Sequence, residues 1–178
     1  MQDAGERVGL VQVYTGDGKG KTTAAIGLAV RAAGWGQRVL IIQFLKARET
    51  GELHGLACLK PGVEIVQAGT VDFVRTAEDR TGAIGLARTG MARAREGVMS
   101  GNYDLVILDE ALVAACLGLI QVPELLDLIY GKPAATELVL TGRNAPQAIK
   151  EAADLVTCMT EVKHPYQRGI EARRGVEY

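Results

Sequence analysis

The residues with the clearest chemical role form the run Thr-Gly-Asp-Gly-Lys-Gly-Lys-Thr-Thr at positions 15–23. Its glycines allow the backbone to curl so that successive N–H groups point inward at an anion. Lys19 and Lys21 add full positive charges, and the hydroxyl of Thr22 can face a magnesium ion carried by phosphates. The run therefore predicts a phosphate-binding loop.

The loop departs from the strict pattern G-x-x-x-x-G-K-[ST], because Thr15 stands at the first glycine position. The simplest alternative is a glycine-rich turn that does no more than begin a helix. Such a turn does not need two lysines and two threonines around one cavity, so nucleotide binding is the better interpretation.

Polar groups that could complete a nucleotide site follow two further apolar runs. Asp109 and Glu110 come directly after Leu105–Leu108, and Arg143 follows shortly after Glu137–Thr141. One carboxylate can hold magnesium, directly or through water, while the other orients it. A guanidinium can grip phosphate or ribose oxygens. The alternatives are an ordinary helix start for the carboxylate pair and a surface arginine at a turn.

These groups require elements that bring them to one place. Apolar runs predict strands over 9–14, 38–44, 63–67, 104–109, 137–141 and 155–162. Helical spacing predicts helices over 22–33, 78–99, 123–130 and 146–153, although four glycines weaken the second of these. The alternation predicts an α/β fold with a doubly wound, mainly parallel sheet, of the P-loop nucleotide-binding (RecA-like) architecture. Ligands of such sheets bind at the carboxyl ends of the strands.

Composition narrows the class of protein. The 178 residues predict one domain, with a short N-terminal extension over 1–8 and a polar tail over 163–178. A net charge of −1 argues against a nucleic-acid partner, and 48% hydrophobic residues exclude wholesale disorder. The longest apolar run, Ala111–Ile120, is about half of a membrane span, and residues 1–7 lack the apolar core of a signal peptide. We therefore expect a cytoplasmic protein without a membrane partner.

The cysteines and histidines suggest no catalytic centre of their own. Cys58, Cys116 and Cys158 are odd in number and widely separated, so we expect reduced, buried thiols rather than disulfides or nucleophiles. His54 and His164 are too few and too far apart for a Cys/His zinc cluster or for a Ser/His or Cys/His pair.

Taken together, the motifs resemble those of the corrinoid adenosyltransferases of the ATP:cob(I)alamin type. The matching runs are Val13–Thr23, Gln43–Lys46, Thr50–Glu52, Leu108–Glu110, Leu140–Asn144, Ala153–Asp154, Glu161–Tyr166 and Gly169–Tyr178. They occur in order from about Gly9 to the last residue, and this family also has Thr at the first loop position.

The resemblance implies transfer of the 5′-deoxyadenosyl group of ATP to the Co(I) of a reduced corrinoid, with triphosphate as the leaving group. It implies that ATP lies with its ribose C5′, rather than its γ-phosphorus, toward the nucleophile. Because cobalt is the nucleophile, no protein nucleophile is expected. A role in cobalamin biosynthesis, an electron-donating reductase as partner and a homodimer are further expectations from the family.

The family's residue roles carry over position by position. The resemblance implies that the loop residues bind the triphosphate of ATP, namely Gly16, Asp17, Gly18, Lys19, Gly20, Lys21, Thr22 and Thr23. It also implies that Lys19 and Lys21 stabilise the charge of the leaving group. Thr22 and Glu110 hold Mg²⁺, with Asp109 behind them. Arg31 and Arg143 lie near the nucleotide. Phe73 covers the lower face of the corrinoid, where family members typically have an aromatic pair.

Two other functions stay open on the sequence. A phosphotransferase or ATPase of the same fold would need a basic lid over the γ-phosphate, for which the arginines of the tail are available. A nucleotide-binding or corrinoid-binding module without turnover would suit the missing aromatic partner of Phe73.

Overall fold

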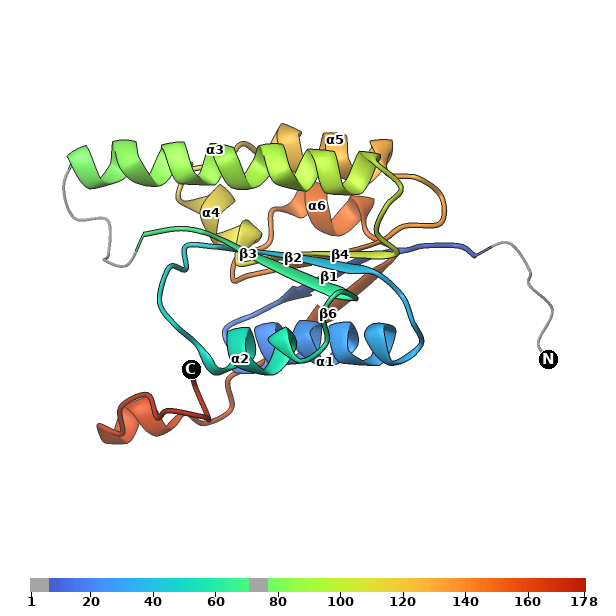
Figure 1. Cartoon of the computed structure of the whole chain (residues 1–178). Coiled ribbons are helices and arrows are strands. Elements are labelled where there is room, and N and C mark those ends of the chain that lie inside the picture. The colour runs from blue at the N-terminus through green and yellow to red at the C-terminus, as the bar shows by residue number, and fades with distance from the viewer. Residues whose placement is uncertain (1–6, 71–76) are drawn as a thin grey trace.

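The computed structural model describes residues 7–70 and 77–178, and within them six strands form one sheet in the order β3-β2-β4-β5-β1-β6 (Figure 1). The strands are β1 (Val11–Thr15), β2 (Val39–Phe44), β3 (Val63–Ala68), β4 (Leu105–Asp109), β5 (Glu137–Thr141) and β6 (Leu155–Cys158). Every neighbouring pair is parallel, so all six carboxyl ends lie at one edge. The predicted doubly wound α/β fold is confirmed.

Helices cover both faces of the sheet (Figure 1). One face carries α1 (Lys21–Gly34) and α2 (Gly51–Ala57), and the other carries α3 (Ala77–Met99), α4 (Ala111–Cys116), α5 (Val122–Gly131) and α6 (Gln147–Ala152). Each face has its own hydrophobic cluster. Because β2 and β4 are covered on both sides, every residue of these two strands is buried.

Small residues bring the helices close to the sheet. The buried positions of α1 include Ala25, Ala29 and Ala32. In α3, a Cβ added to Gly90 would lie 2.6 Å from the Cβ of Ala68, and one added to Gly97 would lie 2.2 Å from a methyl of Leu40. These α3 glycines lower helix propensity but permit close packing, so the predicted helix over 78–99 forms without interruption.

Some element boundaries differ from the prediction. The helices α2 and α4 and the short 3-10 helix η1 (Pro165–Arg168) were not predicted. The last strand ends at Cys158 rather than Val162. Its chain leaves the sheet there because Met159 turns toward the phosphate loop. The Met159 N–H donates to Thr15 O at 2.8 Å, and its carbonyl accepts from Gly18 N–H at 2.7 Å.

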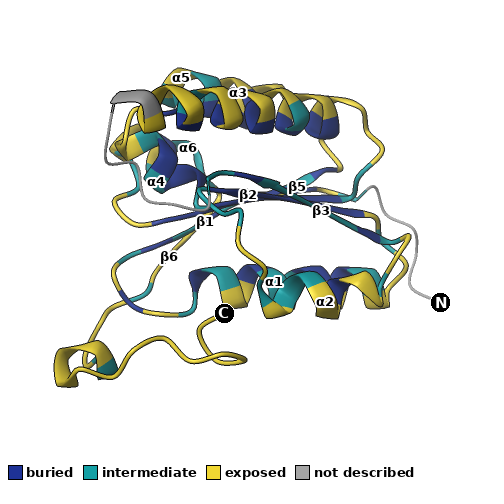
Figure 2. Ribbon diagram, turned by 60° about the vertical axis from the view of Figure 1, so that its left-hand side comes forward, coloured by how far each residue is buried: buried dark blue, intermediate teal, exposed yellow. Residues whose placement is uncertain are grey.

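The prediction that the cysteines are buried is wrong, because Cys58, Cys116 and Cys158 are all exposed. Cys58 follows the surface helix α2, and Cys116 is the last residue of α4. Cys158 lies on β6, an edge strand whose four residues are all exposed (Figure 2). Among the helices in the described ranges, none is long and apolar enough to span a membrane.

Candidate functional site

The strand order brings the predicted site residues to one edge. β5 lies between β1 and β4, so the loop after β1, Arg143 after β5 and the carboxylates at the end of β4 follow three adjacent strands. The non-glycine residues with positive φ among those described are Leu45, Glu110 and Asn144, which follow β2, β4 and β5. Backbone conformations of this kind cost energy and gather at functional sites.

The phosphate loop depends on its glycines because the chain after β6 lies against it. A Cβ on Gly16 would stand 2.3 Å from the carbonyl oxygen of Met159, and one on Gly18 would stand 2.8 Å from the carbonyl of Thr160. Gly16 and Gly20 also have φ of +93° and +121°, and Gly20 is the N-cap of α1. The glycines therefore fix the path of the loop into the helix.

Lys21 lies within the loop that precedes it. Its Nζ donates to the carbonyl oxygens of Gly16 at 2.6 Å and Gly18 at 2.8 Å, and the residue is 7% exposed. Burial lowers the pKa of Lys21, and so does the charge of Arg143, whereas Glu110 raises it. The ammonium is thus held at the first turn of α1, where the helix N-terminus also favours an anion.

The carboxylate of Asp109 is saturated with hydrogen bonds. One oxygen, Oδ1, accepts from the hydroxyls of Thr22 and Thr141, each at 2.8 Å. The other, Oδ2, accepts from Lys46 Nζ at 2.8 Å and Gln43 Nε2 at 3.2 Å. The side chain is 1% exposed. Asp109 therefore joins α1, β2, the loop after β2 and β5 to β4, and it orients the Thr22 hydroxyl.

The neighbouring Glu110 is arranged differently. Its φ is 59°, and its N–H donates to Thr141 Oγ1 at 3.0 Å. Among residues 7–70 and 79–178, none donates a hydrogen bond to its carboxylate, which faces a cavity. Burial, and then the negative charge of Asp109, raise the pKa of Glu110. This carboxylate is therefore available for a cation.

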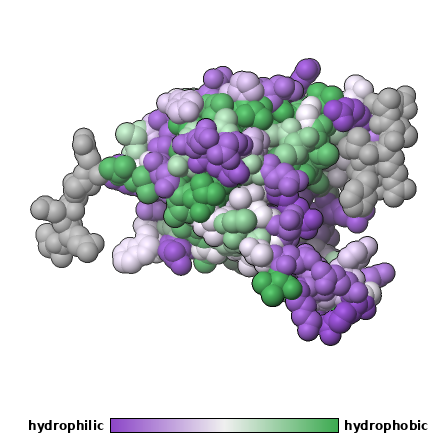
Figure 3. Space-filling model, turned by 180° about the vertical axis from the view of Figure 1, so that it is seen from behind, coloured by the Kyte–Doolittle hydropathy of each residue, from purple (hydrophilic) through white to green (hydrophobic). Residues whose placement is uncertain are grey.

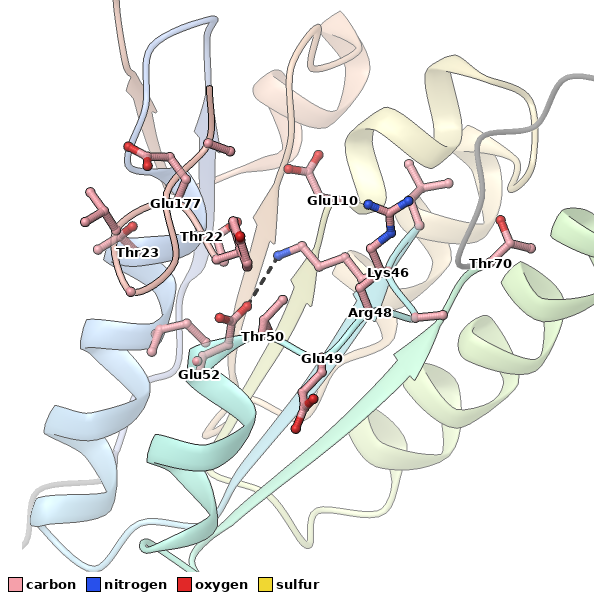
Figure 4. A pocket seen from close by; sticks show the side chains of 18 residues that line it. Thr22, Thr23, Lys46, Arg48, Glu49, Thr50, Glu52, Thr70, Glu110 and Glu177 are labelled. Carbon is pink, nitrogen blue, oxygen red and sulfur yellow. Dashed lines mark ion pairs between the residues drawn. The ribbon is translucent and has the colours of Figure 1, made fainter. Parts of the chain in front are cut away.

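A cavity of about 900 Å³ opens beside these groups (Figure 4). Its walls come from the start of α1, the connection between β2 and α2, and the chain's last residues. The lining residues labelled in Figure 4 are Thr22, Thr23, Lys46, Arg48, Glu49, Thr50, Glu52, Thr70, Glu110 and Glu177. Lys46 reaches across toward Glu52, with Nζ 3.7 Å from Oε1. The volume lies in the range of small-molecule sites.

The remaining predicted residues divide into three groups. Arg143 and Asp17 influence Lys21 electrostatically, and Arg143 also influences Glu110, so the structure brings these charges together. Arg31 lies in the last turn of α1, about 15 Å along the helix from Lys21, and is not brought to the loop. Phe73 lies outside the described residues.

Sequence reasoning gave no role to three residues that hold Asp109, namely Gln43, Lys46 and Thr141. The sequence feature that could have identified them is their position, because each stands at or just after the carboxyl end of a predicted strand, where ligands of such sheets bind.

The oxygen atoms of Thr22 and Glu110 are suitable ligands for a magnesium ion. Mg²⁺ prefers oxygen ligands and is commonly held by one or two protein groups together with phosphate oxygens and water. Thr22 donates its hydroxyl hydrogen to Asp109, which leaves the lone pairs of its oxygen free, and Glu110 supplies a carboxylate that accepts no hydrogen bond from residues 7–70 or 79–178. In the described part of the chain, no group of three or more His, Cys, Asp or Glu side chains forms a metal site.

Comparison with known proteins gives consistent matches along the whole chain. A family model described as ATP:corrinoid adenosyltransferase BtuR/CobO/CobP matches residues 7–178. A protein named corrinoid adenosyltransferase from Sinorhizobium sp. is 37% identical over 174 residues, which cover 96% of this chain and 80% of that protein. Proteins of the same name from Pseudomonas aeruginosa and Escherichia coli are 35% and 32% identical over 179 residues, covering all of this chain and 88% and 90% of theirs.

Proposed function

The chain belongs to the ATP:corrinoid adenosyltransferase family, and from this premise we propose how its site performs the reaction. The enzyme transfers the 5′-deoxyadenosyl group of ATP to the cobalt of a reduced corrinoid. The Co(I) electron pair forms the bond to C5′, the C5′–O bond breaks, and its electrons leave with the triphosphate. Membership of this family argues against the two alternative functions, phosphoryl transfer and binding without turnover.

The phosphate loop binds the triphosphate of ATP. The N-terminus of α1 and the loop N–H groups other than that of Gly18, which donates to Met159 O, face the anion, and Lys21 places its charge within the loop. As the C5′–O bond breaks, negative charge grows on the leaving triphosphate. Positive groups that are already in place stabilise this charge without having to rearrange. Lys21 does this from a fixed position, and Lys19 adds a second cation.

Thr22 and Glu110 would hold Mg²⁺, and Asp109 orients the Thr22 hydroxyl. When bound, the ion neutralises phosphate charge and fixes the conformation of the triphosphate. The observation that carries this assignment is the contrast between adjacent carboxylates, since Asp109 accepts four hydrogen bonds and Glu110 faces the cavity.

Other roles are inferred from the family. Arg143 contacts the nucleotide, which its electrostatic influence on Lys21 and Glu110 supports. Arg31 as a nucleotide ligand and Phe73 at the corrinoid stay predictions of the sequence. The reductase, the homodimer and the cytoplasmic location also stay predictions.

The test is anaerobic incubation of the protein with Mg·ATP and chemically reduced corrinoid, following the visible spectrum for a cobalt–carbon bond. The wild-type protein should form the adenosylated product. Lys21→Ala should lose most of it, and Glu110→Ala should form little of it at the Mg²⁺ concentration that serves the wild type. Lys150→Ala, on the opposite face of the sheet, should keep it. Full activity in both site variants would overturn the assigned roles.

A further inference from the structure

The second lysine of the phosphate loop is bound by the carboxyl-terminal end of the chain. Lys19 Nζ donates to the carbonyl oxygen of Val176 at 2.9 Å and to Glu177 Oε1 at 3.2 Å. More than 150 residues separate these partners, with |i−j| of 157 and 158. Two of the three hydrogens of the ammonium therefore point at the tail.

A compact turn presents Glu177 to Lys19. Arg173 donates to the Glu177 carboxylate through its backbone N–H at 2.7 Å and its guanidinium at 3.0 and 3.2 Å. The Glu177 N–H returns a bond to Arg173 O at 2.9 Å, and Gly175, with φ of +76°, donates to Tyr178 O at 2.7 Å. The Arg173 hydrogen bonds lower the pKa of Glu177 to about 2, with Lys19 contributing, so the carboxylate is charged at neutral pH.

This turn lies in the cavity where we propose that the nucleotide binds, so the turn and the nucleotide compete for the same space. Gly175–Tyr178 line the same cavity as Thr22, Thr23 and Glu110 (Figure 4). All residues of 166–178 are exposed, and the segment forms a hydrophilic protrusion at the lower right of Figure 3. A segment with so little burial can be displaced at low cost, because few apolar contacts hold it.

We propose that Glu177 is an exchangeable counter-ion of Lys19, which the triphosphate of ATP displaces on binding and which returns to Lys19 when the product triphosphate leaves. This inference rests on the proposed nucleotide site. A carboxylate and a phosphate offer the same anionic oxygen acceptors, so both cannot satisfy the same Lys19 donors. A Glu177 carboxylate left beside a bound triphosphate would also repel it. Return of the tail therefore weakens the grip on the product and favours its release.

The experiment measures the dissociation constant of magnesium tripolyphosphate by calorimetry, with Mg·ATP measured in parallel. Glu177→Gln removes the competing charge and keeps the shape of the side chain. It should tighten tripolyphosphate binding about two- to fivefold, the size of one exposed ion pair. Deletion of residues 173–178 should act in the same direction. Glu171→Gln is the matched control, because it removes one exposed charge from the same segment and should leave the constant unchanged.

A double-mutant cycle ties the effect to Lys19. In a Lys19→Gln background, Glu177→Gln should tighten binding less than it does in the wild-type background, because the shared cation is gone. The proposal is overturned if Glu177→Gln binds tripolyphosphate no better than wild type, or if Glu171→Gln tightens binding equally. If the wild-type protein binds tripolyphosphate and Mg·ATP, either of these two results refutes the role of the tail but not the proposed nucleotide site. Failure of the wild type to bind both tripolyphosphate and Mg·ATP would instead refute the site itself, and the tail's role with it.

Discussion

The inner and outer parts of the proposed nucleotide site hold their charges in different ways. In the inner part, Lys21 and Asp109 are buried and bonded to the loop backbone and to side chains of α1, β2, β5 and the loop after β2. In the outer part, Lys19 is bonded to an exposed tail, and Glu110 faces the cavity without a hydrogen-bond donor among the residues described. The inner groups are thus fixed by the fold, whereas the outer groups can exchange partners.

This difference separates two tasks that one site must perform. Stabilising charge on a leaving group requires dipoles and cations that do not move during the reaction. Capturing ATP and releasing triphosphate requires groups that find another partner when the ligand is gone. The comparison therefore predicts large, catalytic effects for inner substitutions and smaller, binding effects for outer ones.

The largest effect is expected for Lys21→Ala. Removing one preorganised group that stabilises developing charge typically costs about 10²–10³ in rate. We expect kcat to fall by roughly that factor in the cobalt–carbon bond assay, with a smaller change in the KM for ATP. Lys150→Ala is the control and should retain wild-type kinetics. A loss confined to KM would place Lys21 with the outer, binding groups.

Asp109→Ala should destabilise the protein itself. The substitution leaves Thr22, Thr141, Gln43 and the half-buried Lys46 without their shared acceptor. We expect a loss of roughly 2–4 kcal/mol in the free energy of unfolding, measured by urea denaturation. Asp127→Ala, which removes an exposed carboxylate paired with Arg95, should cause no measurable change. Equal stability of the two variants would contradict the role of Asp109 as the inner junction.

Glu110→Gln should raise the Mg²⁺ concentration needed for ATP binding by at least about tenfold. Loss of a residue that only orients a metal ligand already lowers metal affinity about 10–100-fold, and Glu110 is proposed to bind the ion directly. The urea midpoint should stay near wild type, because no described residue depends on this carboxylate for a hydrogen bond. Unchanged magnesium dependence would remove Glu110 from the proposed metal site.

The raised pKa of Glu110 also predicts a pH dependence. The carboxylate must be deprotonated to bind a cation, so affinity for magnesium is complete above the raised pKa and falls as the pH drops through it. The acid limb of Mg·ATP binding should therefore begin at a higher pH than for an ordinary glutamate. The Glu110→Gln variant should bind Mg·ATP weakly at every pH and show no such acid limb. If the variant shows an acid limb of the same shape, the limb belongs to a group other than Glu110.

The smallest effect is expected for Lys19→Ala, because Lys19 is exposed and already has an alternative partner. We expect ATP binding to weaken about two- to fivefold and kcat to fall by no more than a similar factor. A loss as large as that of Lys21→Ala would remove the distinction between the two parts of the site.

Much of the inner site could be predicted from the sequence. The glycines and Lys21 lie between an apolar run and a helical pattern, and Asp109 ends another apolar run. Local patterns of this kind determine strands and loops, and the parallel sheet then aligns their carboxyl ends. The doubly wound parallel sheet, and the place of the glycine-rich loop between β1 and α1, followed from this reasoning.

The partners of these site residues could not be predicted in the same way, because they come from distant segments of the chain. Nothing local to Glu177 indicates that it meets Lys19, and the exposure of Cys158 follows from the edge position of β6. The hydrogen bonds of Gln43, Lys46 and Thr141 to Asp109 likewise depend on strand order, which the residue pattern alone does not specify. α2 and α4 are too short for a helical period to stand out.

The most direct test of the account is the identity of the phosphate product. We would incubate the protein anaerobically with Mg·ATP and reduced corrinoid, quantify the adenosylated corrinoid, and separate the phosphates by anion exchange. One triphosphate should be released for each cobalt–carbon bond formed, because the proposed reaction breaks the C5′–O bond and leaves the three phosphates joined. ADP and inorganic phosphate appearing in step with turnover would contradict it.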